Sequence, residues 1–293
     1  MSRRRPTLAL VLLCKEVESG GCGAGETRRS DYRDQQSPIH PSTLSIKERT
    51  KTNTQIDEIA DGIYRLSTFV PDVGPTGFTF NQFLIDDDEP LLFHTGQRML
   101  FDSVSEAIAT VLPVETLRWI TFGHVEADEC GAMNQFLAAA PRAEVAHGAL
   151  GCMVSLNDLA DRPPVPLADG QVLELGRHRV RHIDTPHVPH GWEARVLFEE
   201  TTKTLLCGDL LTQLGQGPAV TSNDVLAAAS EAEDVFGASC LGPASAPTIR
   251  SLADLDPNTL AVMHGSSVTG DCSGTLQGLA DDYERRLLTS TAP

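Results

Sequence analysis

The chain has 293 residues, of which 41% are hydrophobic and 22% charged, a composition typical of globular proteins with a sizeable core. No apolar run approaches the ~18–20 residues that a membrane-spanning helix needs, which excludes a transmembrane protein. The net charge of −17 would repel phosphate backbones and anionic lipids, so neither nucleic acid nor membranes are expected partners. Seven scattered cysteines without a CxxC pair are unlike a disulfide framework and favour a cytoplasmic location.

Residues 1–54 are rich in Gly, Ser, Thr, Arg and Gln and have weak hydrophobic periodicity, which predicts a disordered extension. The run LALVLLC after three arginines is similar to a secretory signal, but it is short and no small-x-small cleavage site follows it, so we do not expect a signal peptide. Ordered patterns begin at Gln55. Residues 55–293 are therefore predicted to form one domain.

Apolar β-rich runs and helical patterns alternate along this domain. Strands are predicted at residues 62–69, 80–88, 89–96, 117–123, 143–148, 178–184, 193–200, 203–209 and 259–265. Helices are predicted at residues 100–112, from after Gly131 to Ala139, and at 245–255 and 274–288. Hairpins combined with βα alternation indicate a layered α/β protein.

Three alternate polar residues, His124, Glu126 and Asp128, directly follow the predicted strand 117–123. Imidazole and carboxylate groups of this kind bind divalent and trivalent metals, and a loop at a strand end can turn them towards one point. The same segment could instead be an acidic loop that only caps the following helix.

Three further strand ends also deliver histidine or carboxylate side chains. Strand 178–184 is followed by TPHVPH, which contains His187 and His190, while Asp209 and His264 close two later strands. In α/β sheets, ligands bind outside the carboxyl ends of strands. The repeated placement therefore predicts that these side chains converge on one site.

The order HxExD, then TP followed by His, then GD and HG resembles the metallo-β-lactamase fold over about residues 55–290. Hydrolases of that superfamily typically carry His at the second polar position of the first motif, where this chain has Glu126. Glu at this position resembles the di-iron branch, which contains flavodiiron proteins and stand-alone oxygen-binding di-iron proteins. The resemblance implies a four-layer αβ/βα sandwich.

The resemblance also implies a ligand set for two metals. One ion would be held by His124, Glu126 and His190, a second by Asp128 and His264, and both would be bridged by Asp209. The family has His where Glu129 stands, so either Glu129 is a further ligand or water fills that position. Asp209 and Glu129 are the residues expected to act in catalysis. His190 is preferred to His187 as the metal ligand of this turn. This choice requires a one-residue insertion relative to the family pattern.

The expected cofactors are two iron ions. Three imidazoles and at least three carboxylates form a hard, oxygen-rich set that suits iron or manganese better than zinc, although both remain alternatives. Metals that share a carboxylate lie ~3.5–4 Å apart and accept a bridging oxygen ligand. Nothing like a flavodoxin module follows residue 288 and no GxGxxG follows a strand, so neither FMN nor NAD is expected in this chain.

Two functions follow from this reading. The resemblance implies a protein that binds or reduces O2, or NO, with an external electron-donor protein for any reduction, and it suggests a homodimer. The alternative is a binuclear metallohydrolase in which a metal-bridging hydroxide attacks an ester, thioester or lactone. A fold retained as an interaction module with a dead site is a third possibility.

Overall fold

The computed structural model describes residues 53–290, so the predicted N-terminal extension lies almost entirely outside the described residues. Thr54, which the sequence patterns place in that extension, is the first residue of a strand. Within the described residues, no helix has the length and apolar character needed to cross a membrane.

The first sheet contains seven strands whose order in space follows the chain. They are β1 (Thr54–Ala60), β2 (Ile63–Val70), β3 (Phe78–Ile85), β4 (Leu91–Phe93), β5 (Trp119–Thr121), β6 (Glu144–Gly148) and β7 (Val165–Leu167). Strands β1 to β4 pair antiparallel, whereas β4 to β7 pair parallel. The parallel half sends the carboxyl ends of its strands to one edge.

The second sheet also has seven strands, in the order β12-β14-β13-β11-β10-β9-β8. Their bounds are β8 (Val172–Glu174), β9 (Arg179–Asp184), β10 (Arg195–Glu199), β11 (Thr204–Leu206), β12 (Val220–Thr221), β13 (Thr259–Ala261) and β14 (Ser267–Thr269). Strands β11 and β13 are parallel neighbours although more than fifty residues separate them. Their carboxyl ends therefore lie side by side.

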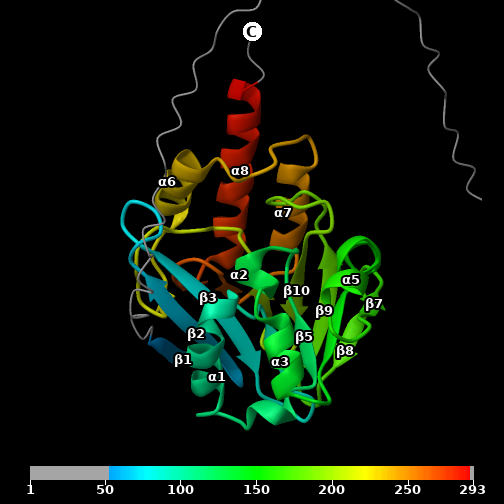
Figure 1. The fold of residues 1–293 in the computed structure, drawn as a ribbon. Helices are drawn as coiled ribbons and strands as arrows, with labels where there is room; N and C mark the ends of the chain where they lie inside the picture. Colours follow the sequence, from blue (N-terminus) through cyan, green and yellow to red (C-terminus); the bar gives the residue numbers. More distant parts are fainter. Residues whose placement is uncertain (1–52, 291–293) are drawn as a thin grey trace, which may run out of the picture. The chain divides into compact units, whose positions relative to one another are not determined.

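Six of the helices form two groups (Figure 1). One group accompanies the first sheet and contains α1 (Phe101–Ile108), α2 (Ala127–Cys130) and α3 (Met133–Ala139). The other accompanies the second sheet and contains α6 (Leu226–Phe236), α7 (Ser245–Ala253) and α8 (Cys272–Ser290). Short helical turns complete the set: η1 (Arg98–Leu100), η2 (Val114–Thr116), α4 (Ala149–Gly151), η3 (Cys152–Leu156) and α5 (Asn157–Leu159).

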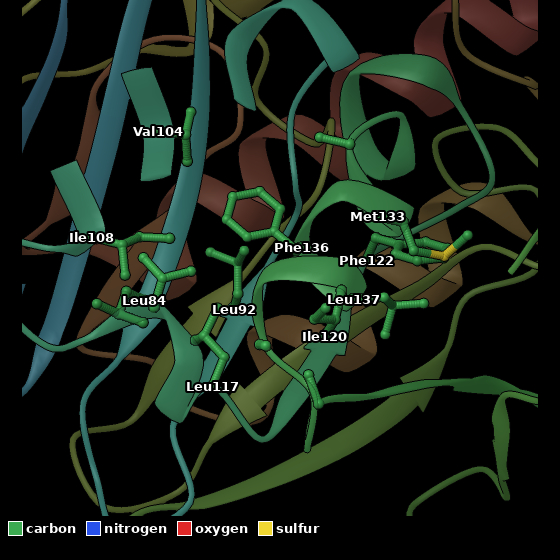
Figure 2. Packing of buried hydrophobic residues seen from close by; sticks show 14 of the residues in the cluster. Leu84, Leu92, Val104, Ile108, Leu117, Ile120, Phe122, Met133, Phe136 and Leu137 are labelled. Carbon is green, nitrogen blue, oxygen red and sulfur yellow. The ribbon is translucent and has the colours of Figure 1, made fainter. Parts of the chain in front are cut away.

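Alternation along the strands assigns side chains to separate core layers. In β3, Leu84 joins the buried cluster of α1 and α3, where it lies near Ile108 and Leu92 (Figure 2). Its neighbours Phe83 and Ile85 point the other way, into a cluster between the two sheets. Because successive strand residues face opposite sides, one strand serves both layers.

The second sheet repeats this arrangement. Leu197 of β10 belongs to the cluster between the sheets, whereas Val196 and Phe198 pack with residues of the second helix group, including Ile249 and Leu276. Helices thus cover the outer face of each sheet, which confirms the four-layer αβ/βα sandwich.

Most predicted strands and helices are present but several strands are shorter than predicted. The run 117–123 is a strand only over Trp119–Thr121, since the following residues leave the sheet to form the loop that carries His124. The sequence patterns did not reveal β1, β7, β8, β12, β14 or helix α6, whose 11 residues contain four alanines and little polar alternation.

Candidate metal centre

The predicted site residues lie on loops at one edge of the two sheets. His124, Glu126 and Asp128 lie between β5 and the end of α2, and His190 lies between β9 and β10. Asp209 and His264 follow the parallel strands β11 and β13. The sandwich therefore brings together segments that are up to 140 residues apart in the sequence, as the strand-end argument predicts.

Four of these side chains form one cluster. Donor atoms of His124, Glu126, His190 and Asp209 all lie within 4.8 Å of one another. His124 Nε2 is 2.7 Å from Glu126 Oε2 and 3.0 Å from His190 Nε2, and His190 Nε2 is 3.3 Å from Asp209 Oδ2. These atoms could contact a single ion.

A second group lies on the other side of Asp209. Its Oδ1 is 3.3 Å from His264 Nε2, and that nitrogen is 3.4 Å from Asp128 Oδ2. Asp209 thus turns one carboxylate oxygen towards each group, the arrangement that a bridge between two ions requires.

The chemistry of these contacts fits cations. His124 Nδ1 lies 3.2 Å from Glu129 Oε1. Nε2 of the same ring faces Glu126 Oε2 and His190 Nε2 together, an arrangement that is favourable only with a proton or another cation between these atoms. Asp209 Oδ1 is buried and accepts no hydrogen bond from the described residues. Both features are those of ligands rather than of a finished hydrogen-bond network.

The pKa shifts of two histidines show that nearby carboxylates give the donor group a negative potential. Burial disfavours the charged form of His124, yet Glu129, Glu126 and Asp209 together raise its pKa to about 12. His264 is likewise opposed by burial, but Asp128 and Asp209 raise its pKa to about 10. Groups of this kind attract protons when no metal is bound and would release them to a metal.

Glu129 does not face this group. Its carboxylate is fully buried, Oε2 accepts a 2.5 Å hydrogen bond from the backbone N–H of His124, and Oε1 lies 3.4 Å from His94 Nε2. Glu129 therefore lies behind His124, with Oε1 3.2 Å from Nδ1 of the ring, and the structure does not place it where a ligand of the second ion would be. The reason is local: α2 begins at Ala127, and one turn of helix carries residue 129 towards the core while Asp128 stays at the rim.

Of the two histidines in the TPHVPH turn, only His190 reaches the cluster. The His187 side chain is exposed and its backbone has a φ of 65°, whereas His190 Nε2 contacts three of the other donor groups.

His264 is anchored by residues of β3 that the sequence patterns did not single out. Its Nδ1 lies 2.7 Å from the carbonyl oxygen of Thr79, and Thr79 Oγ1 accepts a hydrogen bond from the backbone N–H of Gly265. Asn81 Nδ2 donates to the carbonyl oxygens of Val262 and Gly265. Polar residues inside a fully buried strand were the available signal, since such groups need partners.

The remaining candidates lie outside the donor group. His147 and His182 are fully buried, and burial lowers the pKa of both. The thiol of Cys130 donates to the carbonyl oxygen of Glu126, and burial raises its pKa to about 12. That thiol stays protonated, so it is a poor metal ligand.

The donor group lies in the wall of a cavity of about 660 Å³. Glu126, Asp128, His190, Asp209 and His264 all line it, so small molecules can reach the side chains that would hold the ions. Helix α6 and the middle of α8 form another part of the wall, and α6 had no counterpart among the predicted elements.

Comparison with known proteins yields one family and a consistent set of relatives. A family model described as "ODP family beta lactamase" matches residues 78–265. Rubredoxin-oxygen oxidoreductase of Megalodesulfovibrio gigas is 25% identical over 143 residues, which make up 48% of this chain and 35% of the relative. A putative diflavin flavoprotein from Nostoc sp. is 24% identical over 46% of this chain and 23% of its own length. The chain thus aligns with about a third or less of these relatives.

Solved structures show the same fold. The rubredoxin oxygen:oxidoreductase from Desulfovibrio gigas superposes with a TM-score of 0.68 at 20% identity, covering 78% of this chain and 62% of that one. A fragment of a putative diflavin flavoprotein from Nostoc sp. superposes with a TM-score of 0.70 at 17% identity. The superposition covers 82% of this chain and 99% of that fragment. The motif resemblance is confirmed, and the chain belongs to the ODP family of beta-lactamase-like proteins.

Proposed function

We propose that the clustered side chains hold two metal ions and that the protein binds or reduces O2 at this pair. The observation that carries the proposal is the orientation of Asp209, which directs Oδ2 towards His124 and His190 and Oδ1 towards His264. A carboxylate placed between two such groups is suited to bridge ions ~3.5–4 Å apart.

Iron is the proposed metal. The first ion would be held by His124, Glu126 and His190, the second by Asp128 and His264, with Asp209 shared between them. Nitrogen and carboxylate oxygen donors without sulfur suit iron or manganese, and the relatives named above include an oxygen oxidoreductase. We propose that any reduction draws electrons from an external donor protein, as the name of that relative implies for rubredoxin.

The chain's own residues would prepare the site. Bound iron would supply the electrons and the open coordination positions for O2. Glu129 orients His124 through Nδ1, and the Thr79 carbonyl orients His264 in the same way, which keeps each Nε2 directed at the ions. Phe78 stacks on the His264 ring with 4.2 Å between ring centroids and keeps water from that side of the group.

Anaerobic purification, metal analysis and oxygen titration test the proposal. We expect about two iron ions per chain and an absorption change when O2 is added. A colourless zinc protein that hydrolyses a generic ester would instead support the hydrolase alternative, and a preparation that binds no metal would refute both.

The two histidines of the TPHVPH turn provide a matched pair of variants. His190→Ala should lower the metal content, because its Nε2 contacts the other donor groups, whereas His187→Ala should leave it unchanged. The opposite result would mean that the ligand assignment in this turn is wrong.

A further inference from the structure

We infer that the cavity beside the donor group binds an organic ligand with an elongated apolar body and an oxygen-donor head group that contacts the metal pair. This inference rests on the proposed function for the head group, and on the cavity walls for the body. It assigns a class of ligand much larger than O2.

The size of the cavity is the first argument. Its volume of about 660 Å³ lies within the ~300–1,000 Å³ typical of sites for small organic molecules. A water molecule occupies ~30 Å³ in the liquid, and a diatomic gas needs comparable room. Binding O2 alone would leave most of the cavity without a role.

The walls are the second argument. Phe78 contacts the His264 ring, and its own ring centroid lies 5.4 Å from that of Phe236 at the end of α6. Leu211 and Leu279 line the same space. A continuous apolar surface therefore runs from a proposed metal ligand to α6, which suits an alkyl or aromatic body rather than a polar one.

A hydrogen-bonded triad in the same wall adds a polar contact. Ser239 Oγ lies 2.6 Å from Tyr283 Oη and 2.8 Å from Glu233 Oε2. Since a serine hydroxyl has one proton, the consistent arrangement is that Tyr283 donates to Ser239 and Ser239 donates to Glu233. The half-buried carboxylate of Glu233 retains capacity to accept a hydrogen bond from a hydroxyl or amino group on the ligand.

The metal pair favours an oxygen-donor head group at the other polar part of the cavity. The four positive charges of two divalent ions would be balanced by Glu126, Asp128, Asp209 and the buried Glu129 behind His124, so an oxygen anion would be held by open coordination positions and not by excess positive charge. A carboxylate or hydroxamate attached to an apolar chain combines both requirements.

Hydroxamates of different length provide the test. The protein is loaded with zinc, which is redox-silent, and binding of octanohydroxamate and acetohydroxamate is measured by calorimetry. Each methylene buried against an apolar wall strengthens binding about fourfold. We expect octanohydroxamate to bind at least ~50-fold more tightly; equal affinities would overturn the inference.

Two variants on α6 distinguish the loss of a cavity-wall contact from a general effect on the helix. Phe236→Ala should weaken octanohydroxamate binding about tenfold and leave acetohydroxamate binding and zinc content unchanged. Val235→Ala is the control, because Val235 is 48% exposed on the same helix and does not line the cavity. Equal effects of the two variants on octanohydroxamate would also contradict the inference.

Experiments on metal-free protein show whether the cavity inference or the metal-pair assignment is wrong. Binding of 1-octanol, followed by NMR, should depend on Phe236 without any metal. If the protein takes up no zinc but binds octanol in this way, the proposed function and the head-group contact are wrong and the apolar site stands. If zinc and acetohydroxamate bind but octanol does not, the cavity inference is wrong and the metal pair stands.

Discussion

Two histidine–carboxylate groups in this protein use the same residue types in opposite ways. In the turn after β10, Glu199 accepts hydrogen bonds from the backbone N–H groups of Thr201 and Thr202 at 2.8 and 2.7 Å, and His178 Nδ1 lies 3.2 Å from Oε1. At the donor group, Asp209 Oδ1 accepts no hydrogen bond from the described residues and its carboxylate faces other ligand-type atoms.

The difference separates a structural carboxylate from a candidate ligand. Both carboxylate oxygens of Glu199 accept hydrogen bonds from the backbone N–H groups and the hydroxyl of the following turn, so this carboxylate has its partners without any further atom. The group around Asp209 concentrates negative charge and unshared lone pairs at one point, which only a cation would complete. Residue types are alike in the two regions, and the partners of each carboxylate oxygen distinguish them.

The largest expected effect comes from removing the shared carboxylate. Asp209→Ala should reduce the metal content from two ions per chain to almost none, because both groups lose a ligand together. Elemental analysis of the purified variant measures this, with circular dichroism as the check that it is folded. Retention of two ions would refute the assignment of Asp209 as a bridge.

Removal of the carboxylate behind His124 should have a smaller effect. Glu129→Ala should weaken metal binding about 10–100-fold, since the ring of His124 loses the partner of its Nδ1. Competition with a chromophoric chelator gives the affinity. Glu129→Gln can still accept a hydrogen bond from the backbone N–H of His124 and should retain more affinity than the alanine variant. An alanine variant with unchanged affinity would show that Glu129 does not position the ring.

Removal of the Glu199 carboxylate should change the stability of the fold and not the metal content. Glu199→Ala should lower the free energy of unfolding by about 2–3 kcal/mol, because backbone N–H groups lose their acceptor, and should leave metal content unchanged. Chemical denaturation measures the first quantity and elemental analysis the second. Glu174→Ala is the control: it breaks an exposed ion pair with Arg179 and should cost less than about 1 kcal/mol.

The smallest effect concerns pH. Burial opposes the charged form of Glu199, but hydrogen bonds from Thr202 and Thr201 prevail and lower its pKa. The carboxylate therefore stabilises the fold above the unfolded pKa of ~4.3, and this contribution is lost as the pH falls through the lower folded pKa. The difference in unfolding free energy between the wild type and Glu199→Gln should shrink over that range. A difference that stays constant below pH ~4 would contradict this.

Sequence reasoning came close to the donor group because its members obey a local rule. His124, Asp209 and His264 each follow an apolar strand, and strand ends in a layered α/β protein share an edge. The same reasoning did not decide whether Glu129 is a metal ligand. Its direction depends on where α2 begins and on His94, which lies 35 residues earlier in the chain, and spacing in the sequence does not encode either.

By itself, the sequence determined a layered α/β protein and the set of side chains that end its strands, because hydrophobic periodicity and residue type are local properties of the chain. The tertiary structure alone decided which oxygen of Asp209 faces which partner, that Thr79 and Asn81 hold the loop of His264, and that α6 closes a cavity against Phe78. Each of these rests on contacts between segments separated by tens to nearly two hundred residues, whose relative placement is fixed by packing of the whole fold and not by any local pattern.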